Sequence, residues 1–355
     1  MRVFLRKLIK IFLTNFLIIL SFVFFIELFF GYWFDKDNFG PYMREHRMRN
    51  QPIVFNYKGE TYNYNYKRNY YGFRAGDIEP SKIEAIIMGG SEIDERYKPD
   101  KFTITGYLNE YLKKNNYNFT IINAGIEAQS TVGIIYNFKH WFPKLKDFSP
   151  KLILFYIGVS DTTVAENVNL ENLREVGHVK NTEKIEVFFD NIKSRSILYD
   201  SARIFKFKFL PRKEFIKYDG NIDPDLKNNF QFINYENAIN SYDIKLLKKK
   251  YSVKIKNYLS RIDILYDSSK KINSNPIFIT SVSANGNSKL DFIFNYSLIS
   301  HCERKKYNCI DLAKKLKGNV DHWSDKRHTT KEGSNVVANI IAEDLIKIIK
   351  RLNLI

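Results

Sequence analysis

Cysteine and histidine are scarce in this sequence, which has two cysteines and six histidines among 355 residues. Zinc sites need several such side chains at short, characteristic spacings, and no cluster of this kind surrounds Cys302 or Cys309. We therefore expect neither a metal ion nor another cofactor. The even number and short spacing of the cysteines permit one disulfide in an oxidising compartment, whereas in the cytosol they would be two buried thiols.

A recognisable nucleic-acid-binding module is also absent, although the formal net charge is +17. The lysines are spread along a chain that is rich in asparagine and isoleucine. For these reasons we expect no nucleic acid among the partners. Anionic lipid headgroups or an acidic glycan are the more plausible partners of this charge. With 44% hydrophobic and 27% charged residues, the composition argues against general disorder and predicts one main domain with an appendage.

The amino-terminal region has the pattern of a membrane anchor. A basic segment, residues 1–10, precedes the largely apolar residues 11–34, which are enough to span a bilayer and are interrupted by Asn15 and Glu27. No small-x-small cleavage site follows, so we favour an uncleaved anchor over a signal peptide, which is the alternative. Acidic residues come just after the span, so the positive-inside rule predicts a cytoplasmic amino terminus and an extracytoplasmic (periplasmic or extracellular) remainder. The acidic residues are Asp35 and Asp37.

Beyond the anchor we predict two further parts. Residues 35–80 form an extracytoplasmic lead-in that is polar and rich in tyrosine, and the alternation over 62–66 is typical of an exposed strand or hairpin. Residues 81–355 form the main domain. From about 164 to 250 the pattern loosens, which we interpret as an insertion, either a helical cap beside the active site or a solvated elaboration.

Strand and helix patterns alternate through the main domain. This alternation predicts an α/β fold with a parallel sheet and right-handed crossovers. Short apolar runs indicate strands at residues 84–88, 119–123, 151–157 and 276–280. Amphipathic patterns indicate helices at residues 102–114, 133–142 and 248–271, and a closing helix whose apolar positions run from 337 to 352.

Two short stretches suggest a nucleophile and its base. Gly89-Gly90-Ser91 follows the first strand, so a tight turn would present Ser91 at the carboxyl end of that strand, where ligands of open α/β sheets bind. A serine hydroxyl needs a base, and the base needs a group that fixes its tautomer. His328 and Asp325 suit these roles in a loop before the last helix, which Thr329 and Glu332 would cap. Together the two stretches predict a serine esterase site.

The sequence resembles the SGNH/GDSL hydrolase family in four blocks that occur in the family's order. The blocks are Gly89-Gly90-Ser91, Asn123-Ala124-Gly125, Gly158-Val159-Ser160-Asp161 and Asp325-Lys326-Arg327-His328. The resemblance implies an SGNH-type, flavodoxin-like three-layer sandwich with a central parallel sheet, preceded here by one transmembrane helix. It also implies a catalytic triad of Ser91, His328 and Asp325.

The resemblance further implies an oxyanion hole formed by the backbone N–H groups of Ser91 and Gly125 and by the side chain of Ser160. Serine stands at position 160 where the family has asparagine. Losing one oxyanion donor typically lowers the reaction rate about 10²–10³-fold, so we expect serine in place of asparagine at position 160 to affect the rate.

The predicted function is that of a membrane-anchored serine ester hydrolase. Its resemblance and location favour O-acyl esters, O-acetyl in the first place, of a cell-envelope glycan as substrate. Lipid or lysophospholipid esters are a second substrate class. The same triad would serve an O-acyltransferase on a surface polysaccharide, and a catalytically silent glycan-binding or assembly protein would keep the same fold.

Overall fold

The computed structural model describes most of the chain. The described residues are 2–31, 33–34, 49–117, 119–168, 170, 189, 192–193, 195–199, 201–202, 205 and 216–354. The chain divides into two units, Met1–Tyr42 with Thr182–Pro211 and Met43–Asn181 with Arg212–Ile355. Asp35 and Asp37, which entered the prediction of membrane topology, lie outside the described residues.

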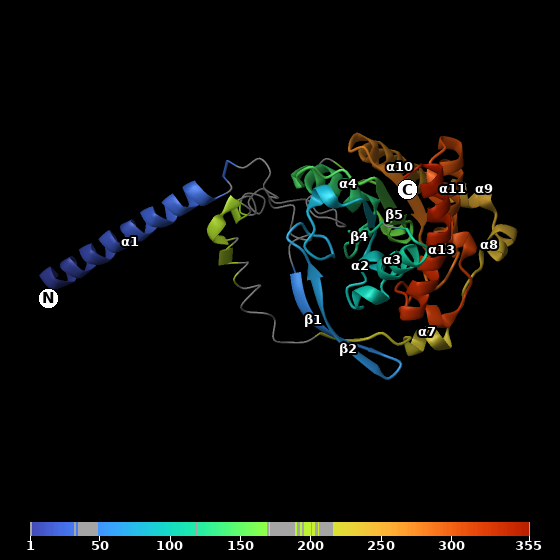
Figure 1. The fold of residues 1–355 in the computed structure, drawn as a ribbon, viewed down its shortest axis with the longest axis horizontal. Helices are drawn as coiled ribbons and strands as arrows, with labels where there is room; N and C mark the ends of the chain where they lie inside the picture. Colours follow the sequence, from blue (N-terminus) through green and yellow to red (C-terminus); the bar gives the residue numbers. More distant parts are fainter. Residues whose placement is uncertain are drawn as a thin grey trace. The chain divides into compact units, whose positions relative to one another are not determined.

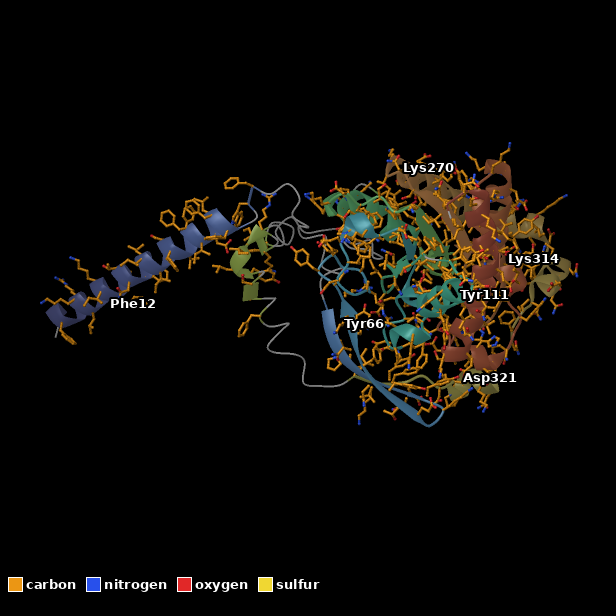
Figure 2. The ribbon with its side chains drawn as sticks, in the orientation of Figure 1. Phe12, Tyr66, Tyr111, Lys270, Lys314 and Asp321 are labelled. Atoms are coloured by element: carbon orange, nitrogen blue, oxygen red, sulfur yellow. A yellow bond between two sulfur atoms is a disulfide. The ribbon has the colours of Figure 1, made fainter. Side chains whose placement is uncertain are left out.

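The first unit contains one long apolar helix, α1 (Arg2–Phe30). An 18-residue window within its stretch Arg6–Phe30 has a mean hydropathy of 2.4, and most large side chains of the stretch are exposed, as Phe12 is in Figure 2. By length and composition α1 can cross a bilayer, a property that an amino-terminal signal sequence shares. The Glu27 carboxylate accepts hydrogen bonds from the Ser196 hydroxyl at 2.6 Å and the Leu198 N–H at 3.1 Å, both from this unit.

The second unit is built on a parallel sheet of five strands in the order β4-β3-β5-β7-β8. This is the 2-1-3-4-5 order of flavodoxin-like sheets, so the predicted α/β fold class is confirmed. The strands are β3 (Ala85–Met88), β4 (Ile121–Asn123), β5 (Leu152–Ile157), β7 (Asn275–Thr280) and β8 (Asn308–Ile310). β3, β5 and almost all of β7 are buried, as expected for a sheet covered on both faces.

Helices cover both faces of this sheet. Ile87, Leu154 and Ile279 share one core with α3 (Ile104–Lys114) and α13 (Lys331–Arg351), which lie side by side in Figure 1. Alternate residues point to the opposite face, where the rings of Phe155 and Phe278 stack at 5.2 Å. That face is covered by α4 (Thr131–His140), α10 (Ser252–Lys271) and α11 (Lys289–Lys305). Burial of each such side chain contributes about 1.5–3 kcal/mol.

Several elements differ from those that the sequence predicts. The helix expected at 248–271 is two helices, α9 (Ile244–Lys250) and α10, separated at Tyr251. The sequence pattern missed α11 because its buried residues, among them Phe292, Ile293 and Phe294, do not follow a single face. A disulfide between Cys302 and Cys309 joins the end of α11 to β8. Short helices of the second unit include α7 (Pro224–Asn228), α8 (Tyr235–Ser241) and α12 (Leu312–Lys315).

A second sheet of three strands has the order β2-β1-β6. β1 (Arg49–Tyr57) and β2 (Glu60–Arg68) form an antiparallel hairpin from the lead-in segment, in which Tyr66 of Figure 2 is buried. β6 (Ile216–Asp219) comes from the predicted insertion and pairs in parallel with β1, with Tyr218 opposite Phe55. A strand of the insertion is therefore part of the same sheet as the lead-in.

Candidate active site

The turn after β3 holds Ser91 at the first position of the short helix α2 (Ser91–Asp94). A Cβ on Gly90 would come within 2.5 Å of Glu92 Oε2 and 3.1 Å of both the Gln129 carbonyl oxygen and Ser160 Oγ. A side chain at position 90 would therefore require the Glu92 carboxylate to move and the other two groups to give way by a few tenths of an ångström. Close packing around the nucleophile segment therefore favours the second glycine of the first block.

The histidine of the last block reaches this serine. His328 Nε2 lies 2.8 Å from Ser91 Oγ, and His328 Nδ1 lies 2.7 Å from Asp325 Oδ2. The other oxygen of Asp325 accepts the backbone N–H groups of Arg327 at 2.7 Å and His328 at 2.8 Å. These bonds hold the carboxylate in place, so the imidazole has one defined orientation between its two partners.

The charged forms of His328 and Asp325 stabilise each other. Burial disfavours the imidazolium, but the hydrogen bond and charge of Asp325 outweigh burial and raise the pKa of His328 above its ordinary value. Burial also opposes ionisation of Asp325, yet the hydrogen bonds from His328 and Arg327 lower the pKa of Asp325 to about 2. Asp325 is therefore ionised at neutral pH and stabilises a proton on the imidazole.

A buried ion pair connects the nucleophile segment to the histidine loop. Lys98 Nζ lies 2.5 Å from Glu95 Oε1 and donates to the Thr329 carbonyl oxygen at 2.8 Å and to Ser334 Oγ at 2.6 Å. Burial lowers the pKa of Lys98. No sequence pattern predicts this link, because Glu95 and Thr329 are 234 positions apart.

Two of the three predicted oxyanion donors have protein acceptors in the structure. The Gly125 N–H donates to Asn123 Oδ1 at 2.9 Å, and the Ser160 hydroxyl donates to Glu92 Oε1 at 3.4 Å. Gly125 packs tightly behind α2, since a Cβ there would lie 2.6 Å from the Asp94 nitrogen. Close packing is thus one reason for glycine at this position.

The Ser91 N–H donates no hydrogen bond to any described residue. The same holds, over the described ranges, for the N–H of Ala128, whose φ of 60° places it in the left-handed region. Ala128 stands in the loop that follows β4, and its neighbour Gln129 approaches Gly90. Ala128 could not be recognised from the sequence, because alanine carries no signal for a left-handed conformation.

The aspartate of the third block has a different environment. Asp161 is buried and accepts a hydrogen bond from the Thr131 hydroxyl at 2.5 Å, and it lies 3.3 Å from Arg261 Nη2. Burial raises the pKa of Asp161, partly offset by the charge of Arg261. Asp161 therefore ties the turn that carries Ser160 to α4 and α10.

A cleft of about 190 Å³ opens beside Ser91 and His328. One wall is aromatic: the Tyr97 and Tyr218 rings stack at 4.7 Å with 11° between their planes, and Phe55 lies next to Tyr218. A strand of the predicted insertion thus borders the cleft. Most of residues 171–215, where a helical cap or a solvated elaboration was predicted, lie outside the described residues. Among the described residues, no three His, Cys, Asp or Glu side chains are grouped in a way that would hold a metal ion.

Three of the four sequence blocks meet at the carboxyl ends of neighbouring strands β3, β4 and β5, and the fourth brings His328 to Ser91. This is the arrangement that the resemblance implies. The chain has the SGNH/GDSL hydrolase fold.

No family model and no curated protein matches the sequence. Solved structures that match at low identity include TesA, with 8% identity, a TM-score of 0.41 and coverage of 74% of this chain and 97% of that chain. The esterase EstA from Pseudoalteromonas sp. matches with 11% identity, a TM-score of 0.41 and coverage of 75% and 99%. The acetyl xylan esterase AlAXEase matches with 11% identity, a TM-score of 0.40 and coverage of 73% and 98%.

Proposed function

We propose that this protein is a serine ester hydrolase in which Ser91 is the nucleophile, His328 the general base and Asp325 the residue that orients the imidazole. The unbroken chain of hydrogen bonds from Asp325 through His328 to Ser91 Oγ carries this proposal, with distances of 2.7 and 2.8 Å. Nucleophile, base and orienting carboxylate in contact are the arrangement that activates a hydroxyl at neutral pH.

The reaction would run in two halves. Ser91 Oγ attacks the ester carbonyl while its proton passes to His328 Nε2, and the collapsing tetrahedral intermediate releases an alcohol that takes this proton. Water then attacks the acyl-serine with His328 again as base, which releases the acid and restores Ser91. Of the three predicted donors, the Ser91 N–H is the one without an acceptor among the described residues, so it can donate to the oxyanion directly. The Gly125 N–H and the Ser160 hydroxyl would donate to the oxyanion after breaking their hydrogen bonds to Asn123 and Glu92.

The substrates we propose are O-acyl esters, O-acetyl in the first place, of a cell-envelope glycan. A cleft of about 190 Å³ suits a short acyl group better than a long chain. The stacked rings of Tyr97 and Tyr218 offer a flat apolar surface next to the nucleophile, which is the kind of surface that packs against sugar rings.

We also propose that α1 is an uncleaved anchor in the cytoplasmic membrane, with the amino terminus inside and the catalytic unit outside. The basic residues that begin the helix and the apolar stretch Arg6–Phe30 support this topology. A disulfide between Cys302 and Cys309 suits an oxidising compartment.

The decisive experiment is labelling with a fluorophosphonate probe and mass spectrometry of the labelled peptide. We expect one adduct on Ser91, and no adduct in Ser91→Ala or His328→Ala. Hydrolysis of p-nitrophenyl acetate should fall by about 10³-fold or more in both variants, since members of a triad act as a unit. A folded protein without adduct and without hydrolysis would instead favour a silent glycan-binding protein.

A further inference from the structure

Glu92 directly follows the nucleophile and lines the same cleft. Its side chain is buried, with 7% of the residue exposed, and Oε2 lies close to Gly90. The hydrogen bond it receives from the Ser160 hydroxyl, at 3.4 Å, is long. The Glu92 carboxylate therefore belongs to the residue next to Ser91 and lacks the close hydrogen-bond and ion-pair partners that a buried carboxylate normally has.

The other carboxylates of the cleft differ in this respect. Each of four has a basic side chain at 2.5–2.9 Å: Asp94 with Arg68, Glu95 with Lys98, Glu127 with Arg96 and Asp325 with His328. For Glu92, no lysine, arginine or histidine nitrogen of the described residues lies within 4.0 Å. Among the described residues, Glu92 is thus the cleft carboxylate without a basic side chain in contact, although its charge reaches His328 and helps to raise the pKa of His328.

A carboxylate that lies beside the nucleophile without a basic partner in contact slows the hydrolysis of a neutral ester. Negative charge develops on the carbonyl oxygen in the transition state, and a nearby carboxylate repels it. A positive charge on the substrate would remove this repulsion and would pair with Glu92. The Tyr97 ring already has the Arg96 guanidinium 4.7 Å from its centre, so of the two stacked rings in this cleft we take Tyr218 as the favourable neighbour for a substrate cation.

We propose that Glu92 is a specificity residue that binds a protonated amine of the substrate, carried close to the ester carbonyl. A hydroxyl would also donate a hydrogen bond to the carboxylate, but it would leave the charge uncompensated, so the ammonium group is favoured. The amine belongs either to the acyl group or to the alcohol, as in an amino sugar. This inference rests on the proposed ester hydrolysis and narrows its substrate class.

Two pairs of esters of nearly equal shape test the inference. Ethyl alaninate and ethyl isobutyrate differ by an ammonium group in the acyl part, and 2-aminoethyl acetate and propyl acetate differ by an ammonium group in the alcohol part. For each pair, kcat/KM is measured at a pH where the amine is protonated, in the wild type, Glu92→Gln and Glu127→Gln. Glu127 is the matched control, because it lines the same cleft but is paired with Arg96.

In the wild type we expect the cationic ester of at least one pair to be preferred, and the pair identifies the part of the substrate that carries the amine. A charge-assisted hydrogen bond is worth about a 10- to 100-fold preference, so Glu92→Gln should lower the ratio by this factor. Glu127→Gln should keep the wild-type ratio within about twofold. Glu92→Gln should also hydrolyse the neutral esters faster, because the repulsion of the oxyanion is gone.

Equal ratios in the wild type and Glu92→Gln, or an equal loss in Glu127→Gln, would overturn the inference while leaving the esterase intact. Hydrolysis of no ester at all, p-nitrophenyl acetate included, would instead overturn the proposed function. Thermal unfolding serves as the folding control, and Glu92→Gln should melt no lower than the wild type, since the substitution removes an uncompensated buried charge.

Discussion

At the scale of single residues, the proposed reaction depends on which groups hold protons. His328 must be neutral to accept the proton of Ser91, and the neighbouring Asp325 raises the pKa of His328. The same carboxylate that orients the imidazole therefore moves its titration toward higher pH. Activity is lost as the pH falls through the pKa of His328.

Asp325→Asn should lower kcat/KM for p-nitrophenyl acetate by about 10³–10⁴-fold, because the amide no longer selects the tautomer that accepts the serine proton. The substitution also removes the charge that raises the pKa of His328, so the acidic limb of the pH–rate profile should move to lower pH. The control is Asp321→Asn, an exposed aspartate nearby that is labelled in Figure 2. An unshifted limb in Asp325→Asn would contradict the proposed pairing.

At the scale of elements, the loop before α13 positions His328, and the cap of α13 fixes where this loop ends. The sequence pattern predicted Thr329 and Glu332 as a capping box, which is wrong by one residue. Thr330 is the N-cap, and its hydroxyl accepts the Gly333 N–H at 3.1 Å. Glu332 instead pairs with Lys58 Nζ at 3.2 Å, and Thr329 is held by Lys98.

Thr330→Ala should lower the free energy of unfolding by about 1 kcal/mol, the usual cost of losing a threonine cap. The Thr330 hydroxyl also donates to the Asp321 carbonyl oxygen at 2.6 Å, which places the value toward the upper end of the range of about 0.5–2 kcal/mol. Urea denaturation measures the change. Thr330→Ser keeps the hydroxyl and should retain most of the stability, and an equal loss in both variants would rule out the capping role.

At the scale of the whole molecule, the chain joins an apolar helix to a catalytic unit with a parallel sheet. The two units have different compositions, and the formal net charge of +17 describes the sum of both. Such a charge favours approach to anionic lipid headgroups or to an acidic glycan. With the topology that we propose, an uncleaved helix would keep the esterase close to esters of the cell envelope.

The full chain should stay in the membrane pellet after alkaline carbonate extraction, with an intact mass near 42.0 kDa. Protease added to intact spheroplasts should digest the catalytic unit, since we place it outside. A variant without residues 1–34 should remain in the soluble fraction of the cytoplasm, which serves as the control. A shortened, soluble product in the extracytoplasmic fraction would show that α1 is a cleaved signal sequence.

The sequence by itself determined the fold class and the residues of the candidate triad. Strands such as 84–88 and 151–157 are recognisable because they are short, continuous apolar runs, and burial on both faces is a local requirement on their composition. Gly90 and Ser91 could be found because a tight turn after a strand requires a specific local sequence. Helix α11 and the cap of α13 were missed or misplaced because packing decided them.

Only the tertiary structure decided what surrounds the nucleophile. The bond between His328 and Ser91 joins residues that are 237 positions apart, and a contact of this kind depends on the path of the whole chain. The same is true of the Tyr218 wall and of the link through Lys98. Whether a carboxylate such as Glu92 has a basic partner is settled by the three-dimensional neighbourhood, because electrostatic energy depends on distance and burial rather than on position in the sequence.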